Sequence, residues 1–248
     1  MPQFFVMSSD IVDSRCRIAG DDYRHLASVR RVRPDDRIML RDERGDSLSG
    51  RVVNVTDSYI EVEIVGRSAG APPPADITLC MCLLKGKNFD LVIEKAVEVG
   101  VSRIVPVLSE RTIARPADAE ARVTRWDRKA GEAAKQSLRG TRPVIGEIRS
   151  FTELIAGERD RVRIIAHPGA PGSLMQVLRR ERSCGISLLV GPEGGFSPRE
   201  VAAAEEAGWT AAGIGFSQMR AGTAAIVLCG IIVYEWGERD NACSAVST

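Results

Sequence analysis

A strand, a glycine-rich turn and a helix follow one another over residues 186–207. The apolar run 186–190 is typical of a buried parallel strand. Gly191, Gly194 and Gly195 come next, and glycine lets a backbone approach a ligand closely or adopt positive φ. Turns that follow parallel strands are where α/β sheets hold ligands. The segment predicts a binding site, although a turn that only joins two elements has the same composition.

The residues after this turn predict how the helix begins. Ser197 is a favourable N-cap, Pro198 suits the first helical position, and Glu200 completes a capping box. The glycine spacing differs from that of a P-loop or a Rossmann turn. Glu193, inside the turn, would repel a pyrophosphate. A cationic or hydroxyl-bearing ligand suits it better, and S-adenosylmethionine carries a sulfonium, an amino group and a ribose.

Residues 214–225 form a second turn between a strand and a helix. Gly215 and Gly222 provide backbone freedom there, and Thr223 is a candidate helix cap. Arg220 is either a functional cation or an exposed, solvated charge. His167 follows another predicted strand at the same sheet edge, where it either forms a wall of the site or belongs to a plain loop.

The chain has 248 residues and a formal net charge of +1, which gives no overall indication of nucleic-acid binding. The 6 cysteines are scattered without a C-x-x-C pair, so no metal site is expected. The longest apolar stretch, residues 224–236, is too short to span a bilayer, and residues 1–5 do not resemble a signal peptide. These features predict a cytoplasmic protein without membrane contact.

The elements that must position these residues fall into two regions around a proline-rich connector at 66–75. Before the connector we expect one helix at 22–31 and strands at 4–7, 37–40, 47–55 and 59–65. After it we expect strands at 77–83, 103–108, 162–166, 186–190 and 211–214. The helices expected to alternate with them lie at 89–99, 119–138, 173–182, 198–207 and 223–236. That alternation predicts an α/β fold with a parallel sheet.

Basic residues gather in two places. The stretch 111–142 carries many more arginines and lysines than carboxylates, and Arg125 falls near the same helix side as Arg139. Arg30 and Arg31 belong to a second, weaker patch. Each is a candidate phosphate-binding surface, and an ordinary solvated face is the alternative.

Several blocks carry a specific resemblance. Residues 190–196, Val-Gly-Pro-Glu-Gly-Gly-Phe, resemble the signature of the RsmE family, SPOUT-class methyltransferases that modify N3 of a uridine in 16S ribosomal RNA. Further blocks that resemble this family lie at 84–87, 94–104, 109–112, 125–126 and 132–139. The second turn departs from the family pattern, because Ser217 stands where arginine is common and Gly222 where glutamate is common.

The resemblance implies a PUA-like, RNA-binding β-barrel over residues 1–70 and a trefoil-knotted SPOUT domain over 76–240. It implies methylation of U1498, in standard rRNA numbering, with S-adenosylmethionine as cofactor, no metal, and Arg220 as the catalytic residue. The cofactor residues it implies are His167, Leu189, Val190, Gly191, Pro192, Glu193, Gly194, Gly195, Ile214, Gly215, Met219, Arg220, Thr223 and Ala224. The RNA-binding residues expected from the basic stretches and the resemblance are Arg30, Arg31, Arg111, Arg125 and Arg139.

The apolar helix 224–236 has little polar face, which favours burial against a second subunit. The SPOUT resemblance likewise implies a homodimer acting on the small ribosomal subunit. Two alternatives stay open: a SPOUT methyltransferase with another RNA target, and a non-catalytic RNA-binding protein that kept the fold.

Overall fold

The computed structural model describes residues 4–6, 8–42, 45–69, 75–137, 143–160, 162–181, 185–215 and 218–245. The chain forms two compact units, which we describe separately. Unit 1 comprises residues 1–72 and 134–142, and unit 2 comprises residues 73–133 and 143–248. The functional division into residues 1–70 and 76–240 remains a prediction.

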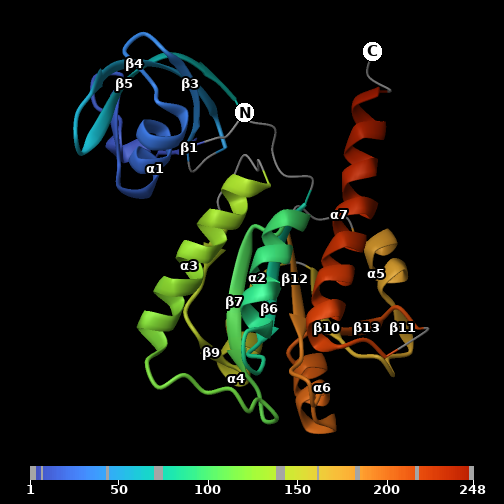
Figure 1. Cartoon of the computed structure of the whole chain (residues 1–248). Helices are drawn as coiled ribbons and strands as arrows, with labels where there is room; N and C mark the ends of the chain where they lie inside the picture. Colours follow the sequence, from blue (N-terminus) through green and yellow to red (C-terminus); the bar gives the residue numbers. More distant parts are fainter. Residues whose placement is uncertain are drawn as a thin grey trace. The chain divides into compact units, whose positions relative to one another are not determined.

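Unit 1 is a curled sheet around its own small core (Figure 1). Its strands are β1 (Phe4–Phe5), β2 (Arg15–Ala19), β3 (Arg37–Arg41), β4 (Ser47–Val55) and β5 (Tyr59–Ser68). They are ordered β1-β3-β4-β5-β2, and only β1 and β3 run parallel. Register shifts in β4 mark bulges, which bend a strand and help the sheet to curl. Every second residue of each long strand enters a core that includes Leu40, Leu48 and Ile60.

Three details of unit 1 differ from the prediction. Strand β2 was not predicted from the sequence, because its alternation of buried Cys16 and Ile18 with exposed arginines is short and strongly charged. The helix expected at 22–31 begins earlier, as α1 (Gly20–Arg24), and continues as the π-helical segment η2 (His25–Arg30). β1 is shorter than expected, and β5 continues to Ser68.

Unit 2 is built on a wholly parallel sheet, as the alternating pattern predicted. Its strands are β6 (Asp76–Cys82), β7 (Arg103–Leu108), β8 (Val144–Ile145), β9 (Arg149–Ser150), β10 (Val162–Ala166), β11 (Gly172–Ser173), β12 (Gly185–Val190) and β13 (Thr210–Gly213). Its helices are α2 (Asn88–Val99), α3 (Ala119–Gln136), α4 (Phe151–Gly157), α5 (Leu174–Arg180), α6 (Pro198–Glu206) and α7 (Ala221–Ala245). The strands are ordered β11-β13-β10-β12-β6-β7-β8, with β9 paired to β7.

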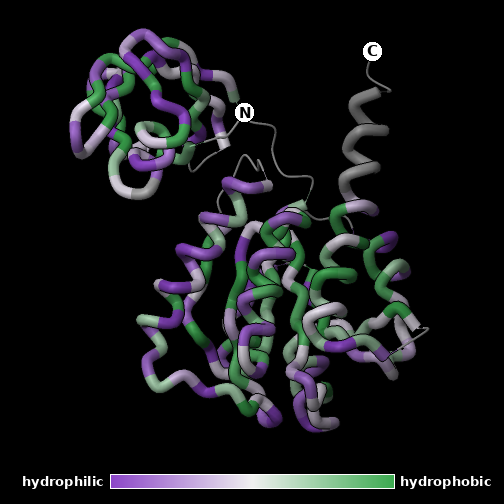
Figure 2. The backbone as a smooth tube through the Cα atoms, viewed as in Figure 1, coloured by the Kyte–Doolittle hydropathy of each residue, from purple (hydrophilic) through white to green (hydrophobic). Residues whose placement is uncertain are grey.

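Helices cover both faces of this sheet. Cys80 and Cys82 point to the face where residues of α4 and α6 complete a buried cluster. On the other face, α7 packs against α2 and against β6 and β12 (Figure 1). The strands are mainly hydrophobic and α3 carries many hydrophilic residues (Figure 2). This arrangement explains the continuous apolar strand sequences, since both faces are buried.

The strand order brings distant loops to one sheet edge. β12 lies between β6 and β10, so the chain must pass β10 to form β13 before it returns as α7. The turns after β10, β12 and β13 therefore meet at the carboxyl ends of three adjacent parallel strands. The trefoil knot that the resemblance implies remains a prediction.

The short elements at the sheet edge have a local cause. β8 pairs with Arg103 and Ile104, whereas β9 pairs with Val107 and Leu108. Pro106 lies in the gap between them, and a proline has no N–H to donate to a neighbouring strand. The pairing of β7 is therefore split between two short strands.

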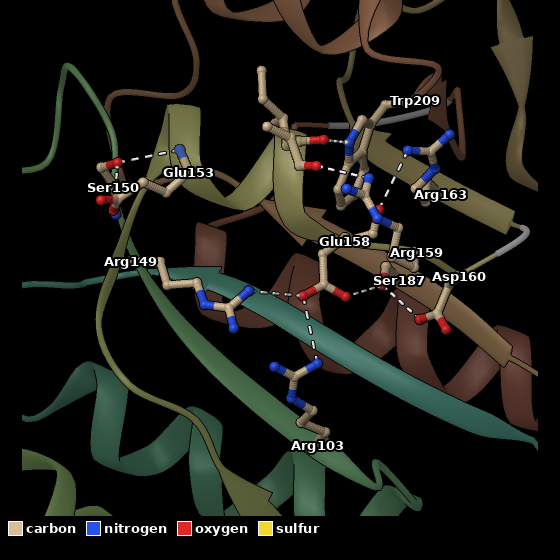
Figure 3. A network of polar contacts seen from close by, with 12 residues as sticks. Arg103, Arg149, Ser150, Glu153, Glu158, Arg159, Asp160, Arg163, Ser187 and Trp209 are labelled. Carbon is tan, nitrogen blue, oxygen red and sulfur yellow. Dashed lines mark hydrogen bonds and ion pairs between the residues drawn. The ribbon is translucent and has the colours of Figure 1, made fainter.

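A buried polar network in unit 2 is centred on Glu158 (Figure 3). Glu158 is only 4% exposed, and its Oε1 lies 3.4 Å from Nη1 of both Arg103 and Arg149. The hydroxyl of Ser187 lies 3.1 Å from Glu158 Oε2 and 2.6 Å from Asp160 Oδ2. A serine hydroxyl donates one proton, so Ser187 donates to Asp160, the closer acceptor. The guanidinium groups of Arg103 and Arg149 neutralise Glu158. The network thereby links β7, β9 and β12.

Candidate functional site

A pocket of about 930 Å³ lies in unit 2, where the ends of β10, β12 and β13 meet the start of α7. Residues of α2 and of the loop before it form another wall. The predicted cofactor residues that line the pocket are His167, Val190, Gly191, Pro192, Glu193, Gly194, Gly195, Ile214, Gly215, Met219, Arg220, Thr223 and Ala224. The two turns singled out from the sequence therefore share one cavity.

Leu189 is not among the lining residues. Its side chain is fully buried in the core cluster on the face covered by α4 and α6. Successive side chains of a strand point to opposite faces, so Val190 reaches the pocket and its neighbour does not.

Gly195 is the residue of the glycine turn that adopts a left-handed backbone conformation. Its φ is +66°, a region that other residues seldom adopt, and its N–H donates to the carbonyl of Pro192 at 2.9 Å. Gly194 has no positive φ. A Cβ at Gly194 would lie 3.4 Å from Cβ of Arg111, so this glycine instead allows the arginine stem to lie against the turn.

Contacts from distant loops hold the turn in place. Arg111 Nη1 donates to the carbonyl of Gly194 at 2.9 Å, and the backbone N–H of Lys85 donates to Glu193 Oε1 at 3.0 Å. Glu193 is therefore partly engaged with the protein itself. Neither contact was predicted from the sequence, which indicated RNA binding for Arg111.

A second set of bonds fixes the start of α6. Ser197 and Glu200 form the predicted capping box. Ser197 Oγ also donates to Glu110 Oε2 at 2.8 Å, and the Glu110 N–H donates to Glu200 Oε1 at 2.8 Å. The loop after β7 is thereby joined to the helix that follows the glycine turn.

The start of α7 differs from the prediction at Thr223. The helix begins at Ala221, and the Ala224 N–H already donates to the carbonyl of Arg220 at 2.9 Å. Thr223 is therefore inside the first turn and is not the cap. A Cβ at Gly222 would lie 3.2 Å from Cγ2 of Val92, so glycine permits the close approach of α7 to α2. Ser217 lies outside the described residues.

The described cysteines are unsuited to nucleophilic chemistry. Burial raises the pKa of the Cys82 thiol to about 12 and that of the Cys229 thiol to about 12. Burial also raises the pKa of Cys80 well above its ordinary value. These thiols stay protonated at neutral pH, as expected of small core residues.

Comparisons with known proteins match both units. Residues 71–233 match the model of an RNA methyltransferase domain, and residues 18–65 match that of an RNA methyltransferase PUA domain. The structure resembles the ribosomal RNA small subunit methyltransferase E of Neisseria gonorrhoeae bound to S-adenosyl methionine. The TM-score is 0.85 and the identity 30%, covering 96% of this chain and 99% of that one. The chain belongs to the ribosomal RNA small subunit methyltransferase E family.

Two further relatives agree with this family. The Aquifex aeolicus ribosomal RNA small subunit methyltransferase E is 30% identical over 209 residues, which cover 83% of this chain and 88% of that protein. A probable rRNA-methyltransferase from Porphyromonas gingivalis has a TM-score of 0.84 and 30% identity, covering 96% of this chain and all of that one (100%). Membership of the methyltransferase E family thus applies to nearly the whole chain.

The predicted RNA-binding arginines of this family member have different surroundings. Arg30 and Arg31 are exposed in unit 1, and Arg31 has a positive φ of 50°. In unit 2, Arg125 Nη2 lies 2.6 Å from Asp90 Oδ1, so this guanidinium anchors α3 to α2. Arg139 lies outside the described residues. The RNA contacts of all five arginines remain predictions.

Within the described ranges, no group of three or more histidine, cysteine or carboxylate residues is arranged to hold a metal ion. None of the described helices is both long and apolar enough to cross a membrane.

Proposed function

We propose that this chain methylates N3 of U1498 in the 16S rRNA of the small ribosomal subunit, in the cytoplasm, with S-adenosylmethionine as methyl donor. The observation that carries the proposal is the pocket that the two predicted turns share. A volume of about 930 Å³ accommodates a nucleoside-sized cofactor with room for a base. The similarity to a relative solved with S-adenosyl methionine supports the same ligand.

The pocket's own residues suit this cofactor. Backbone groups of the turn at 191–195 are available to its amino-acid and adenosine parts, and Glu193 offers a carboxylate to its cationic groups. The ligand supplies an activated methyl group when bound. N3 of uridine carries a proton and becomes a good nucleophile only when that proton is lost. Residues of this chain must therefore favour the loss of the proton.

In our proposal, Arg220 stabilises the uridine anion that forms when the N3 proton is lost. It lines the pocket at the start of α7, where the helix dipole adds positive potential. Loss of the N3 proton spreads negative charge over N3, O2 and O4, and a guanidinium beside O2 or O4 stabilises this anion. His167 Nδ1 accepts a hydrogen bond from the Gly169 N–H at 3.2 Å, which leaves the proton on Nε2. We therefore assign no base role to His167, and the N3 proton leaves to water.

The proposal is tested by mapping rRNA modification in cells that lack this protein. A methyl group on N3 blocks Watson–Crick pairing, so reverse transcriptase stops at the modified uridine. We expect the stop at U1498 to disappear in the deletion strain and to return with a plasmid copy. A stop that persists without the protein would assign the modification to another enzyme.

Arg111 should position the cofactor turn. In Arg111→Ala, the carbonyl of Gly194 loses its charged donor, and we expect the affinity for S-adenosylmethionine to fall about tenfold, measured by calorimetry. Arg199→Ala is the matched control, because Arg199 is exposed on α6 and does not line the pocket. Equal affinities for the two variants would contradict the positioning role.

We also propose that the chain works as a homodimer through α2 and α7. These helices pack together, and each leaves apolar side chains exposed: Leu91 is 52% exposed, Val227 36% and Tyr234 66%. Leu91 also lines the pocket, so a partner seated there would lie beside the site. Val227 and Tyr234 are seven positions apart, so they share one side of α7, and exposed apolar side chains of this kind are a common mark of a subunit interface.

A charge in this face should separate the subunits. We expect Val227→Glu to sediment as a monomer at micromolar concentration, because the interface would bury an unpaired carboxylate. Val144→Glu, at the equally apolar and 60% exposed position on β8, should leave the dimer intact. A monomeric unaltered protein, or a dimeric Val227→Glu variant, would refute this interface.

Unit 1 is proposed to contribute RNA affinity. It contains the match to a PUA domain of RNA methyltransferases, and Arg30 and Arg31 are exposed cations on it. Exposed arginines bind phosphates, and this binding weakens as salt concentration rises.

A further inference from the structure

A smaller cavity of about 200 Å³ lies beside the candidate pocket, and Leu84 lines both. This volume is below the roughly 300–1,000 Å³ typical of small-molecule pockets. The side chains that give the smaller cavity its chemistry are Phe89, Asp90, Arg115, Arg122 and Trp126. They come from α2, from the loop between β7 and α3, and from α3 itself.

Asp90 gives this cavity a buried acceptor. The residue is 8% exposed, and its Oδ1 receives both Arg125 Nη2, at 2.6 Å, and Trp126 Nε1, at 3.1 Å. Across the described part of the chain, no donor is bonded to its Oδ2. Each carboxylate oxygen can accept two hydrogen bonds, so Oδ2 keeps its full capacity for a ligand.

Two arginines complement this acceptor. Arg115 and Arg122 are exposed, and within the described residues neither forms an ion pair with a carboxylate. The Arg122 guanidinium lies 5.9 Å from the centre of the Trp126 ring. The Trp126 and Phe89 rings pack with their centres 4.5 Å apart and form an apolar wall. The cavity thus combines cations, an apolar wall and one anionic acceptor.

We propose that this cavity, together with the exposed arginines that line it, binds a nucleotide that neighbours the methylated uridine in the RNA. Only an edge of the base enters the cavity, and a base with an exocyclic amino group is preferred. The exposed guanidinium groups take the phosphate, and Asp90 Oδ2 accepts from the amino group at the edge of the base. The Phe89 and Trp126 rings, only 2% and 3% exposed, form the apolar lining beside that edge. The inference rests on the proposed function for its RNA strand, since the shared Leu84 places the two cavities side by side. It adds a subsite that reads sequence next to the target.

The Trp126 indole N–H is a direct reporter of this site. Its signal in a ¹H–¹⁵N NMR spectrum of the full chain is assigned by its absence in Trp126→Phe. We expect CMP, AMP and GMP to shift this signal, and UMP, which lacks the amino group, to bind about tenfold more weakly. Ribose 5-phosphate, which tests for a phosphate site alone, should bind more weakly still.

Variants separate the two halves of the site. Asp90→Asn keeps an oxygen for Arg125 and Trp126, and it should bring the affinity for CMP down to that for UMP. Arg122→Ala should weaken all four nucleotides about tenfold and keep their order. Arg128→Ala is the control on the same helix, because Arg128 lies outside the cavity, 4.0 Å from Glu132. If Asp90→Asn does not fold, Arg115→Ala and Arg122→Ala still test whether the two guanidinium groups bind the phosphate.

Two results would overturn the proposal. One is a Trp126 signal that no nucleotide shifts, and the other is ribose 5-phosphate binding as tightly as the nucleotides. The titration requires no methyl transfer, so its outcome is separate from that of the proposed function. If the chain methylates rRNA but no nucleotide shifts the Trp126 signal, only the proposed subsite is refuted. If nucleotides shift the Trp126 signal but U1498 stays unmodified, only the proposed reaction is refuted.

Discussion

Arg220→Ala is expected to slow methyl transfer about a hundredfold or more under single-turnover conditions. Loss of one preorganised donor to a developing anion has an effect of this size in other enzymes. Arg220 is exposed at the pocket wall, so its removal should leave the fold intact. Affinity for S-adenosylmethionine should change far less than the rate, because the guanidinium serves the base and would repel a nearby sulfonium.

The shape of the side chain provides a second test at this position. Arg220→Lys should recover little of the rate, because an ammonium group cannot reproduce the planar, forked donors of a guanidinium. A higher pH should partly rescue Arg220→Ala, since hydroxide lowers the cost of removing the N3 proton. A near-normal single-turnover rate for Arg220→Ala would remove this residue from the chemical step.

Glu158→Ala is expected to lower the free energy of unfolding by about 3 kcal/mol. The change leaves two guanidinium groups without the carboxylate that lies 3.4 Å from each. Breaking a buried ion pair costs roughly 3–5 kcal/mol, and the lower end applies because Arg103 and Arg149 remain 35% exposed and can be rehydrated. Urea denaturation of the full chain measures the difference.

A nearby residue provides the control for the Glu158 network. Glu153→Ala removes only the exposed capping box of α4 and should lower the free energy of unfolding far less than Glu158→Ala does (Figure 3). Both variants should keep their affinity for S-adenosylmethionine, because neither Glu153 nor Glu158 lines the pocket. A Glu158→Ala variant as stable as Glu153→Ala would mean that the network does not hold β7, β9 and β12 together.

The sequence was sufficient for the longer strands of unit 2 and for the start of α6, whereas α7, expected at 223–236, extends over Ala221–Ala245. The apolar runs of β6, β10 and β12 and the capping box at Ser197 are local patterns, and the structure contains each of them. Leu189 could also have been placed correctly, since alternation along β12 assigns it to the face opposite Val190. The two-residue strands β8, β9 and β11 are too short to show any periodicity.

The supports of the site could not be read from the sequence. Arg111 contacts Gly194 across 83 positions, and Lys85 contacts Glu193 across 108. Such bonds depend on the order of strands in the sheet, which no local pattern encodes. For the same reason, the sequence did not predict the ion pair of Arg125 with Asp90, and the RNA contact of Arg125 stays a prediction.

The most direct test of the central claim is methyl transfer by the purified chain. The protein is incubated with methyl-labelled S-adenosylmethionine and small ribosomal subunits from the deletion strain, and the rRNA is digested for nucleoside mass spectrometry. We predict one labelled product, N3-methyluridine, which maps to U1498. Unlabelled rRNA, or label on a ribose or on another base, would contradict the proposed reaction.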